Sequence, residues 1–237
     1  MTAAAFFAIL ILYMRLLKND IIECTVDTLG IYGEGIAHVE GRTVFIRGGL
    51  PGERVRARII FERPTFCDAR LEKILEPSPD RIRPVCPVFG ACGGCALQHM
   101  RYEAELRYKK TRLEETFYKV AHLSVDSRPP VCSPKRERYR NKLSLPVRAG
   151  KDGAMIGFFA RDSHRVVPIA DCWLQPEWVK RVIAVTHDFL EKNGLQGYDE
   201  QTGTGDVRHI TVREIGGRLY IAAVLCHAAT DEDALRR

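Results

Sequence analysis

The feature that most constrains this chain is a group of three cysteines, Cys86, Cys92 and Cys95, spaced C-x5-C-x2-C. Gly93 and Gly94 lie inside the tighter pair, where the missing Cβ lets the backbone fold closely around whatever the sulfurs hold. Thiolates are ligands for zinc and for iron–sulfur clusters. Three ligands leave such a site one short, so a fourth Cys or a His must come from elsewhere in the chain.

The composition indicates the compartment in which such a site operates. The chain has 237 residues, of which 28% are charged and 46% are hydrophobic, as is typical of a globular protein with one or two domains. Its eight cysteines would suit disulfides in a secreted protein, but the sequence shows no good secretory signal. Tight cysteine spacing in an intracellular chain indicates metal binding instead. We therefore expect a cytoplasmic protein.

Residues 1–19 are interpreted as an apolar extension. Ala3–Met14 is an unbroken apolar run, but about 20 residues are needed to cross a bilayer. A signal peptide requires positive charge before such a run and a small-residue cleavage site after it, and both are missing. The sequence therefore predicts no membrane partner, with a membrane anchor as the alternative.

Residues 20–80 alternate apolar and polar side chains between glycine-rich turns. This pattern predicts five strands and no helix, which is typical of a small closed barrel of the OB type. The Pro-rich connector Pro77–Pro84 then marks a domain boundary. The expected strands are Ile21–Leu29, Ile36–Val39, Thr43–Ile46, Arg54–Phe61 and Thr65–Ile74.

Residues 81–237 carry a second pattern, that of an α+β domain on an antiparallel sheet. A helix at Tyr102–Ala121 repeats Leu106, Leu113 and Phe117 at helical spacing, so it must lay an apolar stripe on another element. A further helix is expected at Glu177–Asn193, and the expected strands are Lys142–Val147, Ala154–Ala160, Arg165–Ile169, Val207–Glu214 and Leu219–Leu225.

Positive charge is concentrated in one part of the chain. Residues 99–142 hold 12 Lys and Arg against 6 Asp and Glu, and Lys135–Lys142 interleaves cations with Tyr139. Such a segment is typical of RNA binding, although a solvated helix face and a polar loop are the alternative. The candidate RNA-binding residues are Arg47, Arg54 and Arg56 on the barrel, and Lys135, Arg136, Arg138, Arg140 and Lys142.

Several motifs follow one another in the order of a known enzyme family. Gly30–Val55 resembles a TRAM domain, an RNA-binding barrel of OB type. It is followed by the C-x5-CGGC-x2-Q element, by the YRNK run that ends at Lys142, and by an H-x7-C element from His164 to Cys172. Over residues 21–237 the chain resembles the RNA uracil-5-methyltransferases. It is most similar to the 23S rRNA (uracil-5-)-methyltransferases that carry a [4Fe–4S] cluster.

The resemblance implies a complete ligand set. In that family the Cys of the later element closes the site, which corresponds here to Cys172 beside Cys86, Cys92 and Cys95. The chemistry of the residues alone leaves Cys132 as a serious alternative and leaves zinc as an alternative to iron and sulfur. The remaining candidates fit small buried apolar residues of strands, and they are Cys24, Cys67 and Cys226.

The resemblance also implies a function. The family transfers a methyl group from S-adenosylmethionine to uracil C5 in ribosomal RNA, and no obligate protein partner is evident. The helix-start signals at Thr230–Asp233 predict a chain truncated at its C-terminus. The resemblance implies that the missing part is a Rossmann-like methyltransferase domain, with which the helix at 102–121 would pack. No catalytic residue is therefore expected, and the chain alone is expected to be inactive. The alternative is a non-catalytic RNA-binding protein with an Fe–S or zinc domain.

Overall fold

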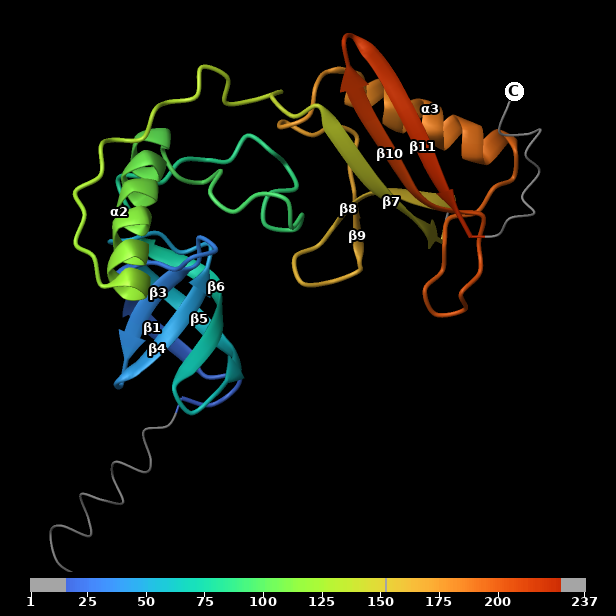
Figure 1. Cartoon of the computed structure of the whole chain (residues 1–237). Coiled ribbons are helices and arrows are strands. Elements are labelled where there is room, and N and C mark those ends of the chain that lie inside the picture. The colour runs from blue at the N-terminus through green and yellow to red at the C-terminus, as the bar shows by residue number, and fades with distance from the viewer. Residues whose placement is uncertain (1–15, 152, 227–237) are drawn as a thin grey trace, which may run out of the picture. The chain divides into compact units, whose positions relative to one another are not determined.

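The computed structural model describes residues 16–151 and 153–226 of the chain, which divide into two compact units. Of the described residues, the barrel unit comprises 16–83 and Ala96–Cys132, and the sheet unit comprises Pro84–Cys95, 133–151 and 153–226 (Figure 1). This division by contacts assigns 96–132 to the barrel, whereas the domains expected from the sequence were 20–80 and 81–237. Those domain boundaries stay a prediction.

The barrel unit is built on a curled six-stranded sheet with the strand order β1-β5-β6-β4-β3-β2. Strand β5 shows why the sheet curls around a core, since Val55, Ala57 and Ile59 are fully buried while the arginines between them face outward. The strands are β1 (Ile21–Thr25), β2 (Thr28–Leu29), β3 (Gly35–Val39), β4 (Arg42–Arg47), β5 (Arg54–Glu62) and β6 (Phe66–Glu76).

The expected count of five barrel strands is wrong, because the predicted first strand is broken in two. The backbone N–H of Val26 donates to the carbonyl of Glu53 at 2.9 Å, and that of Asp27 donates to the carbonyl of Ile36 at 2.7 Å. The chain thus leaves β5 and joins β3 within two residues. Val26 is fully buried at this corner, so an unbroken apolar pattern hides the change of partner.

Helix α2 (Tyr102–Ala121) lies where the helical spacing predicted it, and it packs on the barrel unit. Ala104 is buried against Leu29 and Leu50, and the Tyr108 hydroxyl donates to the carbonyl of Gly30 at 2.6 Å. The distal half of the helix has no such cover. Of the stripe predicted from the sequence, Leu113 and Phe117 are 48% and 41% exposed.

A buried ion pair ties the connector to the barrel. Glu53 is fully buried, and its carboxylate accepts from Arg81 Nη2 at 2.8 Å and from the backbone N–H of Leu50 at 2.9 Å. Burial by itself raises the pKa of Glu53, but the hydrogen bonds from Arg81 and from the Leu50 and Ser78 amides outweigh it and lower that pKa. A carboxylate held this way remains charged in the core.

The sheet unit is an antiparallel five-stranded sheet with the order β11-β10-β7-β8-β9, covered on one face by α3. Leu143, Leu145 and Val147 of β7 are fully buried in the cluster that also holds Val179 and Ile183 of α3. The elements are β7 (Lys142–Gly150), β8 (Gly153–Phe159), β9 (Val166–Pro168), α3 (Trp178–Lys192), β10 (Val207–Ile215) and β11 (Arg218–Leu225).

The fold class therefore differs from the α+β class expected from the sequence. The described chain is mostly β, with a six-stranded and a five-stranded sheet. Most of the expected extension 1–19 and the helix-start signals at Thr230–Asp233 lie outside the described residues. Among the described residues, no helix has the length and apolar character needed to cross a bilayer.

Candidate functional site

The cysteine loop is attached to the sheet unit at the end of β8. Gly93 donates its backbone N–H to the carbonyl of Phe159 at 2.9 Å, and Cys92 forms an isolated bridge with Ala160. A Cβ on Gly93 would lie 2.9 Å from both the Cα and the N of Arg161. Because that approach is closer than real Cβ atoms make, only glycine lets the loop lie this close to the strand.

Cys172 reaches the same unit from the segment between β9 and α3. It is partly buried against the sheet core, and its backbone N–H donates to Asp171 Oδ1 at 2.7 Å. Arg138 pairs with both carboxylate oxygens of Asp171 at 2.8 Å and donates to the carbonyl of Cys172 at 2.9 Å. The segment that carries Cys172 is thus held by an arginine from Lys135–Lys142, the basic run.

The thiols of the loop and of Cys172 influence one another. The pKa of Cys92 is raised, first by burial, and further by the neighbouring Cys172 and Cys86. The backbone N–H of Gly94, 3.4 Å from Cys92 Sγ, and the charge of Arg140 act in the opposite direction. Two segments far apart in sequence therefore bring three of the four predicted ligands within electrostatic range.

These side chains do not stand at ligating distance in the structure. Across residues 16–151 and 153–226, no group of three or more His, Cys, Asp or Glu is arranged to hold a metal ion. The third cysteine of the loop, Cys95, is partly exposed. The donor set of Cys86, Cys92, Cys95 and Cys172 within one unit nevertheless fits a thiolate-bound cluster in chemistry.

The alternative ligands lie in different surroundings. Cys132 is exposed and is the last residue of the barrel unit. Burial and the nearby Asp27 raise the pKa of Cys24 to about 11, which disfavours the thiolate that a metal needs. His99, also in the barrel unit, is 1% exposed, and burial and Arg81 lower its pKa to about 4. The Cys226 N–H donates to the Asp206 carbonyl at 2.9 Å at the end of β11.

The predicted RNA-binding arginines of the barrel face outward but are engaged. Arg54 and Arg56 contact Glu23 at 3.1 and 2.7 Å, and Arg54 also contacts Glu76 at 3.4 Å. Arg47, at the end of β4, is exposed. Since exposed ion pairs are weak, these arginines remain available to a polyanion at the cost of local pairs.

Of the predicted RNA-binding residues of the basic run, Arg138 is largely buried and the others are exposed. Arg138 has a side chain only 14% exposed and lies 5.3 Å from the Trp173 ring. The backbone N–H of Arg140 donates to Leu174 at 3.1 Å, which joins the run to the segment after Cys172. Arg138 therefore positions the Cys172 segment, and the exposed cations of the run are Lys135, Arg136, Arg140 and Lys142.

A second polar cluster was not predicted from the sequence. Arg148 is 7% exposed, and its guanidinium lies 5.2 Å from the Phe159 ring and 5.5 Å from that of Tyr198. It also donates to Glu200 at 2.8 Å, and Glu200 in turn contacts His164 at 3.0 Å. The alternation of β7 was the available signal, because it puts Arg148 on the face opposite Leu145 and Val147.

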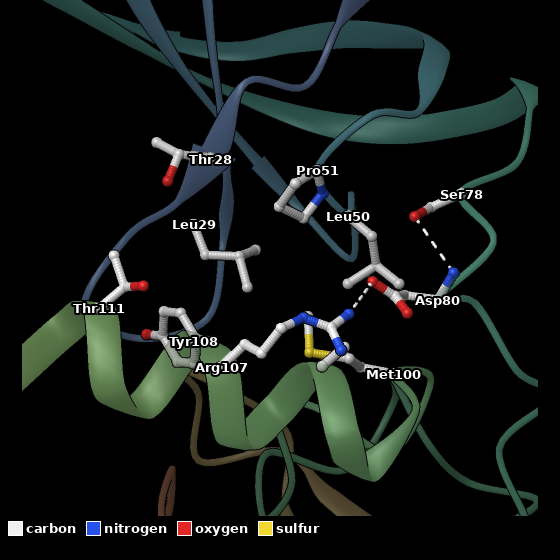
Figure 2. Close-up of a pocket in the computed structure, with 11 residues that line it drawn as sticks. Thr28, Leu29, Leu50, Pro51, Ser78, Asp80, Met100, Arg107, Tyr108 and Thr111 are labelled. Atoms are coloured by element: carbon white, nitrogen blue, oxygen red, sulfur yellow. Dashed lines mark hydrogen bonds and ion pairs between the residues drawn. The ribbon is translucent and has the colours of Figure 1, made fainter. Parts of the chain in front are cut away.

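A hollow of about 210 Å³ lies in the barrel unit, between α2 and the barrel turns. Figure 2 shows Leu29, Leu50 and Met100 around it, with Arg107 reaching across to Asp80. The Arg107–Asp80 pair, at 2.7 Å, already satisfies the charges at this hollow.

Comparison with known families identifies the first unit. Residues 15–71 match the description of the TRAM domain. The barrel is a TRAM domain. The TRAM expectation from Gly30–Val55 is therefore confirmed.

The curated relatives carry names that agree with the rest of the resemblance. An uncharacterised RNA methyltransferase of Halalkalibacterium halodurans is 37% identical over 197 residues, which are 83% of this chain and 43% of the relative. One from Listeria monocytogenes serotype 4b is 37% identical over 209 residues, 87% of this chain and 46% of the relative. The chain thus spans about half the length of the curated relatives it matches.

A solved structure has the same fold. It is the Pyrococcus abyssi tRNA (uracil-54, C5)-methyltransferase in complex with S-adenosyl-L-homocysteine, with a TM-score of 0.66 and 20% identity over 90% of this chain and 48% of that one. The expected description of this chain as α+β and lacking methyltransferase architecture is therefore wrong, because a methyltransferase matches nearly all of it in fold. The expectation of an inactive chain gains no support from the comparison.

Proposed function

We propose that this chain acts in the S-adenosylmethionine-dependent methylation of uracil C5 in 23S ribosomal RNA. The observation that carries the proposal is the match to relatives named RNA methyltransferases over 83–87% of the chain, together with its TRAM domain. S-adenosylmethionine supplies the electrophilic methyl group when bound. The described residues contribute RNA binding and positioning, and we assign none of them to a bond-making step.

The TRAM domain and the basic run would hold RNA in single-stranded form. A uracil is accessible at C5 and C6 only when it is taken out of a helix, so enzymes that modify a base act on loops or flipped nucleotides. Exposed cations such as Lys135 and Arg136 suit the phosphates of such a strand. Contacts between these cations and the phosphates position the RNA. Such contacts carry no sequence information by themselves.

The sheet unit would hold a [4Fe–4S] cluster through Cys86, Cys92, Cys95 and Cys172. A cluster bound there supplies a rigid covalent link between the loop and the segment before α3. The protein's own contribution is the support around the thiols: the close approach of Gly93 to β8, the Gly94 N–H aimed at Cys92, and Arg138 on the Cys172 carbonyl.

The methylation proposal is tested by deleting the gene in its source organism and digesting separated 23S rRNA and tRNA to nucleosides. Mass spectrometry should show loss of 5-methyluridine from the 23S fraction and its return when the gene is restored. Loss from tRNA alone would overturn the ribosomal substrate. Unchanged 5-methyluridine in both fractions would favour the alternative, an RNA-binding protein without this activity.

A further inference from the structure

The sheet of the sheet unit has an open face, which is the side of β7, β10 and β11 opposite α3. Side chains alternate along a strand, so the residues between the buried Leu143, Leu145 and Val212 point to this side. Arg213 is paired in register with Lys142 on one neighbour and with Tyr220 on the other. Residues directly opposite share a face, so these three side chains form one row across three strands.

The next row along the open face is uncharged and hydrophilic. Thr211 is paired with Ser144 and with Ala222, and the hydroxyls of Ser144 and Thr211 are 3.3 Å apart. Small hydroxyl side chains keep this part of the face low, and they offer both donors and acceptors to a ligand.

Beyond that row the open face ends in rings and cations. Phe159 lies 5.6 Å from the ring of His164 and 6.2 Å from that of His209, and the Arg208 guanidinium lies 4.7 Å from the Tyr198 ring. The nearby Glu200 is already engaged by Arg148 and His164. The face thus carries an aromatic side chain at each end, with hydroxyls between.

The charges that β7, β10 and β11 themselves contribute to the open face have one sign. Glu214 is the only acidic residue of β7, β10 and β11, and it faces α3, where it accepts from Trp178 Nε1 at 2.7 Å. Lys142 and Arg213 are exposed, and neither forms an ion pair with another described residue. Tyr220 is 55% exposed beside them. A polyanion would meet attraction at this row, because the carboxylate at the other end of the face, Glu200, is already paired with Arg148.

Exposed aromatic rings beside cations are what proteins use to bind unpaired nucleic acid, because every base has a face that stacks on a ring. We propose that the open face binds a segment of single-stranded RNA, with Tyr220 stacking on a base and with Lys142 and Arg213 contacting its phosphates. The inference rests on the proposed function, and it names the surface of the sheet unit that the RNA occupies.

The chemistry of the face favours RNA over a protein partner. Protein interfaces are enriched in tyrosine and arginine, but they are depleted in lysine, and their fully buried core is more apolar than the surrounding surface. On β11 the exposed apolar residues Leu219 and Ile221 are on the other face, because they alternate with Tyr220, whereas Val224 shares the open face. A protein would therefore find most of its apolar anchors on the other side of the strand.

The test compares two neighbours on β11 in the full chain. Tyr220→Thr and Ile221→Thr replace side chains that are 55% and 63% exposed on opposite faces of the strand by the same residue. Binding is measured by fluorescence anisotropy with a labelled 12-nucleotide oligouridylate. Tyr220→Thr should weaken binding at least about fivefold, from the loss of one stacked base, and Ile221→Thr should leave it unchanged. Tyr220→Phe should retain wild-type binding, since it keeps the ring.

Three results would overturn the inference. Equal affinity of Tyr220→Thr and wild type would exclude stacking on Tyr220 while leaving RNA binding by the chain intact. No RNA binding by the wild type would remove the proposed function as well. A changed molar mass in light scattering for Tyr220→Thr, with unchanged RNA affinity, would identify the face as an interface between protein chains. Circular dichroism of each variant verifies that the strand has formed.

Discussion

Arg138 Nη1 donates to the carbonyl of Cys172 at 2.9 Å while the same guanidinium pairs with Asp171. Residues 34 positions apart are thereby held in one place. The basic run and the segment with the predicted fourth ligand are one structural feature, so changes in the run reach the cysteine site without any contact to sulfur.

Replacing Arg138 by Lys should lower cluster retention. Lysine keeps the charge but cannot donate in parallel to both carboxylate oxygens and to a carbonyl. We expect fewer irons per chain after anaerobic reconstitution, measured by iron analysis and by absorbance. Arg136→Lys, in the same run, is the control and should load as wild type. Equal loading of the two variants would contradict a positioning role for Arg138.

Replacing Cys172 by Ser should abolish cluster retention, because the site would keep only three thiolate ligands. Cys226→Ser is the matched control, since Cys226 is also partly buried in the sheet unit and should not affect loading. The measurement is iron and sulfide per chain after anaerobic reconstitution. A chain that takes up zinc and no iron under these conditions would refute the cluster assignment.

The stability that Asp171 gives to the sheet unit should be lost in acid. Hydrogen bonds from Arg138 chiefly, and also the Cys172 N–H, lower the pKa of Asp171 to about 2. A folded-state pKa below the unfolded value stabilises the fold at pH above the unfolded pKa, and this stabilisation is lost as the pH falls from about 4 to about 2. Urea unfolding should therefore show a steeper loss of stability over this range for the wild type than for Asp171→Asn. If the free energy of unfolding fell equally with pH in the wild type and in Asp171→Asn, the lowered pKa of Asp171 would be contradicted.

Replacing Glu53 by Gln should strongly destabilise the TRAM domain. Arg81 would keep its charge in a site from which its partner charge has gone, and breaking a buried pair costs about 3 kcal/mol or more. The free energy of unfolding in urea measures this. Glu76→Gln is the control, because its side chain is 70% exposed and its contact with Arg54 is 3.4 Å, so it should cost less than about 1 kcal/mol. Similar losses for both would argue against a buried structural pair.

Much of the local structure was predictable because it follows from side-chain periodicity. The expected helix at Tyr102–Ala121 is observed at those residues, and the strand expected at Val207–Glu214 is observed at Val207–Ile215. The strand expected at Lys142–Val147 is observed as β7, Lys142–Gly150. The cysteine loop was visible in the sequence because its three thiols have the short spacing that is typical of metal ligands.

The remaining features depended on partners distant in sequence. Nothing local to Val26 and Asp27 marks the change from one neighbouring strand to the other, since both hydrogen bonds go to distant carbonyls. Periodicity showed that α2 has an apolar stripe but not that its first half packs on the TRAM domain. In the sequence Arg138 resembles its neighbours in the basic run, and only the folded structure places Asp171 beside it.

The sequence by itself determined most of the helices and strands, the apolar stripe of α2, and the residue types available for metal and RNA. Only the tertiary structure decided which strands pair, which cations have carboxylates beside them, and that Lys142, Arg213 and Tyr220 form one row. The reason is physical: alternation and helical spacing are set within a few residues, whereas pairing and charge compensation depend on groups that meet only when the chain has folded.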